Sequence, residues 1–300
     1  MIKGFKNIIL VVLYNENITS SITISSLIKN DCLENDFYLV IWDNSFEVIA
    51  EDELNILKRK NIQYDYIHKK ENTSLSRIYN QIINCYCQIV SKIFIFDQDT
   101  IVDKEYFNLI EKAAFQNDDI GLFLPYVEKN GKVISPSKFK IAVNYSFFDR
   151  EFKFGRTKAK KGIAFGSGMC LKTEIFKNRN LKFDENLSFY GVDYKFVLDY
   201  GELHNYFYII DYELKHDLSF MNEEDVSIKI KRYKSNSYAW LYILFIRLNF
   251  IFQFIGISRL FLDTIKLSIK YKNFEFLKIF AHNLKFLVNN FSKINKTNSF

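Results

Sequence analysis

Two aspartates separated by one residue, Asp97 and Asp99, follow directly after the apolar segment 92–96. In extended backbone, residues two apart point the same way, so both carboxylates could face one ligand. Paired carboxylates are hard oxygen ligands that suit Mg²⁺ or Mn²⁺, and such a cation would neutralise a departing diphosphate. The alternative interpretation is a solvated, aspartate-rich turn. Because the pair follows an apolar segment that reads as a buried strand, we predict a divalent-cation site.

Two further side chains could do chemistry. Asp193 lies in the aromatic segment 189–194, and a carboxylate beside apolar groups tends to have the raised pKa that suits a general base. The alternative is an ordinary acid at the start of a helix. His216, one of four histidines, is a candidate metal ligand, although single histidines more often have a structural role.

Other residues are of types that bind nucleotides. Asp43 follows an apolar run, where a carboxylate could accept hydrogen bonds from a ribose or a base, or could form a turn. The segment 72–77 opens a helix whose N–H groups would favour an anion or would only be capped. Gly166 and Gly168 would let the backbone approach a ligand closely.

The elements that must position these residues alternate between strand and helix. Short apolar or alternating runs predict strands at 8–13, 37–42, 62–67 and 92–96. Amphipathic or charged segments predict helices ending near residue 29 and at 51–60, 74–90 and 104–115. This order is typical of a Rossmann-like, mostly parallel sheet flanked by helices, which binds ligands at the carboxyl ends of its strands.

Other ligand-binding and catalytic motifs are absent from the sequence. It contains no P-loop, no G-x-G-x-x-G and no nucleophile elbow, which disfavours nucleotide binding through a P-loop. Its four cysteines are scattered, so a reducing compartment is the simplest interpretation. We find no convincing secretory signal and predict a cytoplasmic protein.

The C-terminal part of the chain differs from the rest in charge. Residues 226–300 contain thirteen basic and two acidic residues, a net charge of +11, which leaves −5 for residues 1–225 because the whole chain carries +6. The apolar segment 238–262 is interrupted by Arg247 and Asn249, which favours helices lying at a membrane surface over a spanning helix. The alternative is helices packed on the rest of the protein. The apolar runs fit lipid better than nucleic acid.

Seven motifs occur in the order seen in family 2 glycosyltransferases. They are VVLYNEN, WDNS, ENTSLSRIYN, FIFDQDT, AFGSGMCLK, FDENLSFYGVDYKF and KHDLS, within residues 8–234. The sequence therefore resembles this family, and its DQD motif is similar to that of the rhamnosyltransferase-type subgroup. The resemblance implies a GT-A fold. We therefore predict a GT-A catalytic domain at 1–225, followed by the basic, aromatic helical tail at 226–300, which the charge and apolar pattern place at a membrane surface, on the inner face of the plasma membrane.

The resemblance also implies a reaction and roles for individual residues. The reaction is inverting transfer of a sugar, with rhamnose one candidate, from a nucleoside-diphosphate sugar to a hydroxyl of a glycan or lipid-linked acceptor in surface polysaccharide synthesis. Asp193 would be the catalytic base, and a Mg or Mn ion would be bound by Asp97, Asp99 and His216. The substrate-binding residues would be Tyr14, Asn15, Asp43, Asn72, Arg77, Gln98, Gly166, Gly168 and Tyr190.

The sequence departs from the family pattern near the predicted base. Val192 stands where many members have Glu, Asp199 stands where an Arg is usual, and Lys195 stands where an acid is common. One alternative is therefore a catalytically impaired binding protein of GT-A type. Another is a nucleotidyltransferase of similar layout, although residues 14–17 lack the glycine and lysine usual in the nucleotide loop of that class.

Overall fold

The computed structural model describes residues 4–33, 36–129, 131–139, 153–177, 181–216 and 225–297. The chain forms two compact units. The first comprises Met1–Phe139, Ser146–Asn186 and Asp193–Asp217, and the second comprises Lys140–Tyr145, Leu187–Val192 and Leu218–Phe300. The predicted tail lies in the second unit, which also includes the segment that carries Tyr190.

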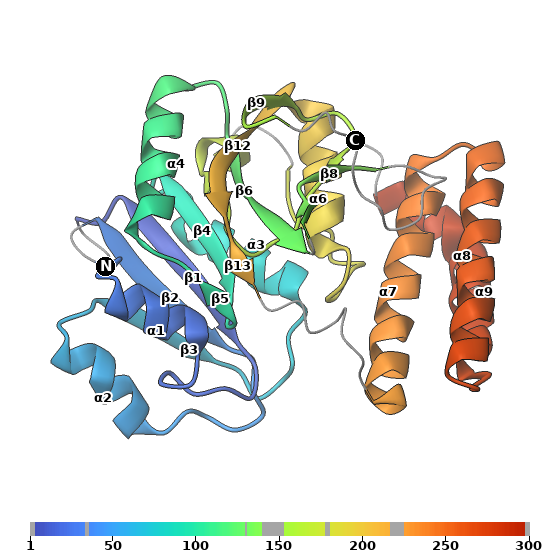
Figure 1. Ribbon diagram of the computed structural model, residues 1–300, viewed down its shortest axis with the longest axis horizontal. Coiled ribbons are helices and arrows are strands. Elements are labelled where there is room, and N and C mark those ends of the chain that lie inside the picture. Colours follow the sequence, from blue (N-terminus) through green and yellow to red (C-terminus); the bar gives the residue numbers. More distant parts are fainter. Residues whose placement is uncertain are drawn as a thin grey trace. The chain divides into compact units, whose positions relative to one another are not determined.

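The first unit is built on a twisted, mixed sheet with strand order β3-β2-β1-β4-β11-β6-β12-β9 (Figure 1). The strands are β1 (Asn7–Leu13), β2 (Phe37–Asp43), β3 (Tyr64–His68), β4 (Lys92–Asp97), β6 (Leu122–Lys129), β9 (Gly155–Lys158), β11 (Met169–Lys172) and β12 (Tyr206–Glu213). The first four are parallel to one another, β11 is antiparallel to its neighbours β4 and β6, and β12 is parallel to β6. The central strand β1 is buried along its whole length, as its apolar sequence predicts.

Helices flank this sheet (Figure 1). They are α1 (Ile22–Lys29), α2 (Glu51–Arg59), α3 (Leu75–Tyr86), α4 (Lys104–Gln116), α5 (Glu174–Lys177) and α6 (Val192–Leu203). The predicted α/β class with a mostly parallel sheet and flanking helices is confirmed. The predicted helix at 74–90 ends earlier, at Tyr86, and the predicted strand at 37–42 continues through Asp43.

Small ladders join loops at the edges of the first unit. The strand β5 (Thr100–Ile101) pairs with β13 (Lys215–His216), β8 (Ser137–Lys138) pairs with β10 (Gly162–Ile163), and β7 (Lys132–Ser135) pairs with β6. The first of these ladders is relevant to function, because it brings residue 216 beside the turn that follows β4.

The second unit contains α7 (Val226–Arg247), α8 (Phe250–Lys270) and α9 (Glu275–Thr297), which confirms the predicted C-terminal helical region. The polar residues that interrupt the apolar segment lie at a helix junction. Asn249 caps α8 by accepting a hydrogen bond from Phe252 N, and Gln253 Nε2 donates to the carbonyls of Phe245 and Leu248 at the end of α7. None of the helices described has both the length and the apolar character needed to cross a bilayer.

Candidate functional site

The turn after β4 is fixed by hydroxyl groups, and it holds the two predicted metal-binding aspartates at the end of the strand. Thr23 Oγ1 donates to Asp97 O at 2.5 Å and accepts from Thr100 N at 2.8 Å. Ser167 Oγ accepts from Asp97 N at 3.1 Å. Both Asp97 and Asp99 are half-buried. The backbone of this turn is thereby anchored to α1 and to the loop before β11.

Gln98, between the two aspartates, contacts the turn after β1. Its Oε1 accepts from Tyr14 N at 2.7 Å, and its Nε2 donates to Tyr14 O at 3.4 Å. Both the oxygen and the nitrogen of the Gln98 side chain therefore bond to the backbone of Tyr14. Its predicted role in substrate binding stays a prediction, and the structure adds a role in joining two strand ends.

His216 is brought to the same place by the sheet. In the ladder between β13 and β5, residue 216 is opposite Thr100, which directly follows Asp99. The side chain of His216 lies outside the described part of the chain. Among the side chains that are described, no cluster of three or more His, Cys, Asp or Glu could hold a metal ion. The two carboxylates at residues 97 and 99 are of the donor type that fits Mg²⁺ or Mn²⁺.

Asp193, at the start of α6, accepts two backbone hydrogen bonds. Its Oδ2 accepts from Gly166 N at 2.9 Å, and its Oδ1 accepts from Tyr194 N at 2.9 Å. The pKa of Asp193 is raised to about 7, chiefly by burial and also by the negative charge of Asp97, while the two N–H donors oppose the shift. Asp193 nevertheless keeps part of its surface accessible. A carboxyl with this pKa can exchange a proton near neutral pH.

Gly166 and Tyr79 complete the surroundings of Asp193. A Cβ placed on Gly166 would lie 3.5 Å from Asp193 Cβ and 3.9 Å from the hydroxyl of Tyr79. Burial, followed by the charges of Asp97 and Asp193, raises the pKa of Tyr79 well above its usual value, so its hydroxyl stays protonated. Sequence reasoning missed Tyr79, because it lies on the apolar face of the helix α3, where an aromatic residue reads as core.

Gly168 has a packing role. Its φ is +78°, and an added Cβ would lie 2.7 Å from both Leu214 Cδ2 and Pro125 Cγ. Tyr106 Oη donates to Gly168 O at 2.8 Å. The atoms that approach Gly168 closely therefore belong to the protein, and its predicted place beside a substrate stays a prediction.

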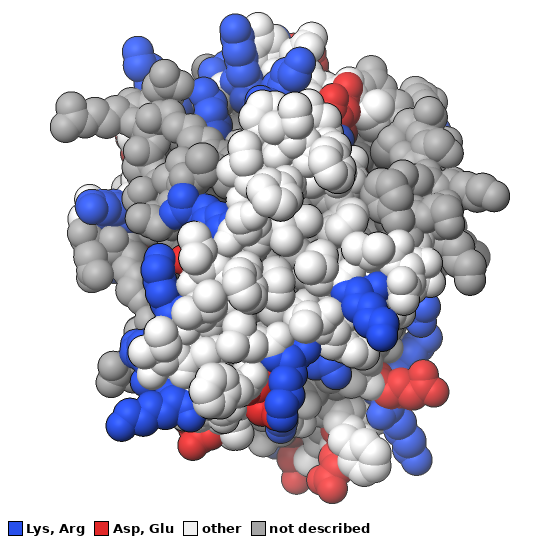
Figure 2. Space-filling model, turned by 90° about the vertical axis from the view of Figure 1, so that its right-hand side faces the viewer, with Lys and Arg blue, Asp and Glu red and all other residues white. Residues whose placement is uncertain are grey.

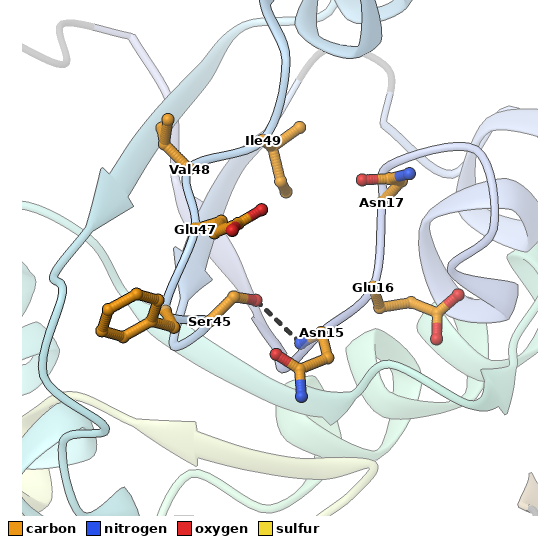
Figure 3. Close-up of a pocket in the computed structure, with 8 residues that line it drawn as sticks. Asn15, Glu16, Asn17, Ser45, Glu47, Val48 and Ile49 are labelled. Carbon is orange, nitrogen blue, oxygen red and sulfur yellow. Dashed lines mark hydrogen bonds between the residues drawn. The ribbon is translucent and has the colours of Figure 1, made fainter.

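A pocket of about 440 Å³ opens at the carboxyl ends of β1 and β2 (Figure 3). Its lining residues are Asn15, Glu16, Asn17, Ser45, Phe46, Glu47, Val48 and Ile49. Asn15 N donates to Ser45 Oγ at 2.7 Å, which joins the two loops that form the walls. The adjacent Tyr14 is half exposed. The predicted nucleotide residue Asn15 thus lines a real cavity, at the sheet edge where this fold class binds ligands.

Asp43 is bonded to Ser45, which lines this pocket. Its carboxyl has no exposed surface, and its two oxygens accept from Ser45 N at 3.0 Å and from Tyr66 Oη at 2.5 Å. Tyr66 Oη in turn accepts from Ile49 N at 3.0 Å. Asp43 therefore shapes the loop that forms one wall, and direct contact with a base or ribose stays a prediction.

Asn44 holds the predicted residue Asn72 beside the end of β2. Asn44 Nδ2 donates to Asn72 Oδ1 at 2.7 Å, and Asn44 Oδ1 accepts from Thr73 N at 2.8 Å. Asn44 is buried, and its bond to Asn72 joins residues that are 28 positions apart in the sequence. Arg77, in the first turn of α3, pairs with Glu185 at 3.3 Å on the surface.

Lys195 and Asp199, which depart from the family pattern near the predicted base, form a buried ion pair. Lys195 Nζ donates to Asp199 Oδ2 at 2.5 Å and lies 3.7 Å from Asp184 Oδ2. All three side chains are buried. This group joins the helix that carries Asp193 to the segment before it. Tyr190 belongs to the second unit, and its predicted role in substrate binding stays a prediction.

The comparisons with known proteins show the fold. No protein-family model matches the sequence, and no curated protein matches it. Among solved structures, the chain is similar to the glycosyltransferase TarS of S. aureus, with a TM-score of 0.54 and 15% identity over 83% of this chain, which spans 41% of that chain. It is also similar to TarS 1-349 in complex with UDP, with a TM-score of 0.53 and 16% identity over 86% of this chain and 71% of that one. A third structure, TarS 1-349 in complex with UDP-GlcNAc, gives a TM-score of 0.50 and 12% identity over 96% and 92% of the two chains. The chain therefore has the fold of a glycosyltransferase of known structure.

Proposed function

We propose that this protein is a glycosyltransferase that moves a sugar from a nucleoside diphosphate to an acceptor hydroxyl. The observation that carries the proposal is the pairing of Asp193, whose pKa is raised to about 7, with the negative charge of Asp97 at the carboxyl ends of the sheet. The shared fold with TarS, which was solved with UDP and with UDP-GlcNAc, supports it.

In the proposed reaction Asp193 acts as the general base. Its carboxylate takes the proton of the acceptor hydroxyl while that oxygen attacks the anomeric carbon of the donor. The bond between the anomeric carbon and the diphosphate oxygen breaks on the opposite face, so the configuration is inverted and the diphosphate leaves with the electron pair. The Gly166 N–H, bonded to Asp193 Oδ2 at 2.9 Å, orients the carboxylate for this step.

Asp97 and Asp99 are the residues that would hold a divalent cation, Mg or Mn, together with His216. When bound, the cation would supply charge neutralisation for the leaving diphosphate. Asp97 lies close enough to Asp193 to raise the pKa of Asp193. A bound cation would account for this gathering of acidic side chains. The fixed turn around Gln98 keeps the two carboxylates at the strand end.

The pocket beside Asn15 would take the nucleoside of the donor. It lies at the carboxyl ends of the strands, and the exposed ring of Phe46 and the amides of Asn15 and Asn17 line it. Aromatic rings stack on bases and amides bond to their polar edges. Asp43 and Tyr66 support the pocket through the bond between them.

The acceptor that we propose is a glycan or a lipid-linked sugar, and rhamnose is the first donor sugar to test, in line with surface polysaccharide synthesis at the inner face of the plasma membrane. Lys195 and Asp199, which depart from the family pattern, bond to each other at 2.5 Å, and the turnover assay below distinguishes an active enzyme from a catalytically impaired protein.

A donor screen tests the proposal. The purified protein is incubated with Mn²⁺, a glycan or lipid-linked sugar as acceptor, and a panel of nucleotide sugars, and release of nucleoside diphosphate is scored. We expect release with one donor, loss of release in Asp193→Asn with donor binding retained, and loss on chelation. The control is Asp118→Asn, a surface carboxyl that is 97% exposed. Normal turnover in Asp193→Asn would refute the role of Asp193, and binding without turnover of any donor would indicate a binding protein.

A further inference from the structure

The helix α8 carries large apolar side chains on the outside and small or polar ones on the inside. Gly256 is buried, and a Cβ there would lie 2.7 Å from Leu244 of α7. Thr264 is fully buried, and its hydroxyl is 2.5 Å from that of Tyr233. This is the reverse of the usual surface helix, whose apolar stripe faces the core.

The exposed side of α8 forms a continuous apolar face, which we call the outer face of α8. It consists of Phe250, Ile251, Phe252, Phe254, Ile255, Phe261, Leu262 and Ile269, all exposed. Ile251, Ile255, Leu262 and Ile269 are spaced by four and seven residues, which puts them on one side of the helix. Ile251 and Phe254 are each 67% exposed. A stripe of this length marks an interaction surface.

Basic residues border this apolar surface. Figure 2 shows a broad area of uncharged side chains with lysines and arginines around it, and with acidic side chains mainly along its lower border. Lys266, Lys270 and Lys272, at the end of α8 and just after it, are exposed. Residues 226–300 contain thirteen basic and two acidic residues, which gives this segment a net charge of +11.

We propose that the outer face of α8 inserts into the interface of an anionic lipid bilayer, with the lysines bound to its headgroups. Apolar side chains bordered by lysines are the pattern of helices that lie in a membrane interface. Association of two copies through this face would bring like charges together and is disfavoured. The inference rests on the proposed function in one respect, because it gives a reason for the acceptor to be lipid-linked. Vesicle binding itself needs neither donor nor acceptor, so it can be tested separately from the proposed function.

Vesicle sedimentation tests the inference. The full-length protein is mixed with vesicles of phosphatidylcholine alone or with one third phosphatidylglycerol, at low and high salt. We expect binding only to the anionic vesicles, weakened by salt. The double variant Ile251→Ser, Phe254→Ser should lower the partition coefficient at least tenfold, because two exposed apolar side chains no longer enter the interface. Neutralising Lys266, Lys270 and Lys272 with glutamine should cost about fivefold for each residue.

The matched control is Phe115→Ser, which removes an exposed phenylalanine from α4 of the first unit, where it is 87% exposed. It should leave vesicle binding unchanged. Equal binding of the double variant and wild type, or no binding to anionic vesicles, would overturn the inference. If wild type forms a dimer in sedimentation velocity and the double variant does not, the face binds a second copy of the chain, and that result also overturns the inference.

Binding of the donor is measured by calorimetry on the same variants. A variant that loses vesicle binding but still binds the donor supports the inference about the outer face of α8 and leaves the proposed function untouched. Absence of donor binding in the wild type would refute the proposed function.

Discussion

Replacing Asp193 with asparagine tests whether the folded protein favours the neutral form of this carboxyl. Burial raises the pKa of Asp193 from 3.8 to about 7 in the folded state, and the unfolded chain has the ordinary value. The folded state therefore binds the proton more tightly than the unfolded state. The stabilisation from this proton is fully present below about pH 4 and is lost as the pH rises to about 7.

The size of the effect follows from the two pKa values. A difference of about three pKa units corresponds to about 4 kcal/mol over the whole titration, at about 1.4 kcal/mol for each unit. Between pH 5 and pH 8 the loss is about 2.5 kcal/mol. Asparagine does not titrate, so the stability of Asp193→Asn relative to wild type should rise by about that amount over the same interval. The variant also loses an acceptor for Gly166 N or Tyr194 N, but this cost does not depend on pH.

Urea unfolding followed by circular dichroism, at several pH values between 5 and 8 with chelator present, measures this difference. Asp118→Asn removes one negative charge from the surface and therefore controls for the change in net charge. Its stability relative to wild type should not rise between pH 5 and pH 8 as that of Asp193→Asn does. Parallel stability curves for wild type and Asp193→Asn would refute the raised pKa. Titration of the carboxyl carbon by NMR gives the pKa directly.

Three other substitutions have expected outcomes. Asp97→Asn removes a like charge from the neighbourhood of Asp193, so it should lower the pKa of Asp193 in the same NMR titration, and an unchanged value would contradict the electrostatic contact. Gly168→Ala introduces a Cβ 2.7 Å from two side chains at a φ of +78°, and thermal unfolding should show a loss of about 1–3 kcal/mol or more. Lys195→Met leaves two buried carboxylates without their cation and should cost about 3–5 kcal/mol in urea unfolding. A loss below about 1 kcal/mol in either of the last two would show that the site relaxes freely.

The sheet was predictable because its strands are short apolar runs with clear boundaries. The run at 8–13 becomes β1 (Asn7–Leu13), and the acidic residues after the run at 92–96 lie at the end of β4, as predicted. The junction at Asn249 was visible in the sequence only as an interruption of an apolar segment. Its role as a cap depends on where α7 ends, which local pattern does not determine.

The details of the site depend on contacts that are distant in sequence. Asp43 was predicted from its place after a strand, but its burial follows from Tyr66, 23 residues away, which donates to it. Tyr79 has the periodicity of a core residue, and only the fold shows that the charges of Asp97 and Asp193 are close enough to raise its pKa. Lys195 and Asp199 are an exception, because they lie only four residues apart and bond to each other on α6, a helix that was not predicted.

The buried pair on α6 has a consequence for how this sequence can change. Loss of Lys195 alone leaves the buried carboxylates of Asp184 and Asp199 without a cation, so a one-step change at position 195 should be selected against. Loss of all three charges together, with apolar replacements of similar volume, avoids that penalty. Lineages that descend from this chain should therefore vary at 184, 195 and 199 in concert, and those three positions should drift as a single unit of inheritance.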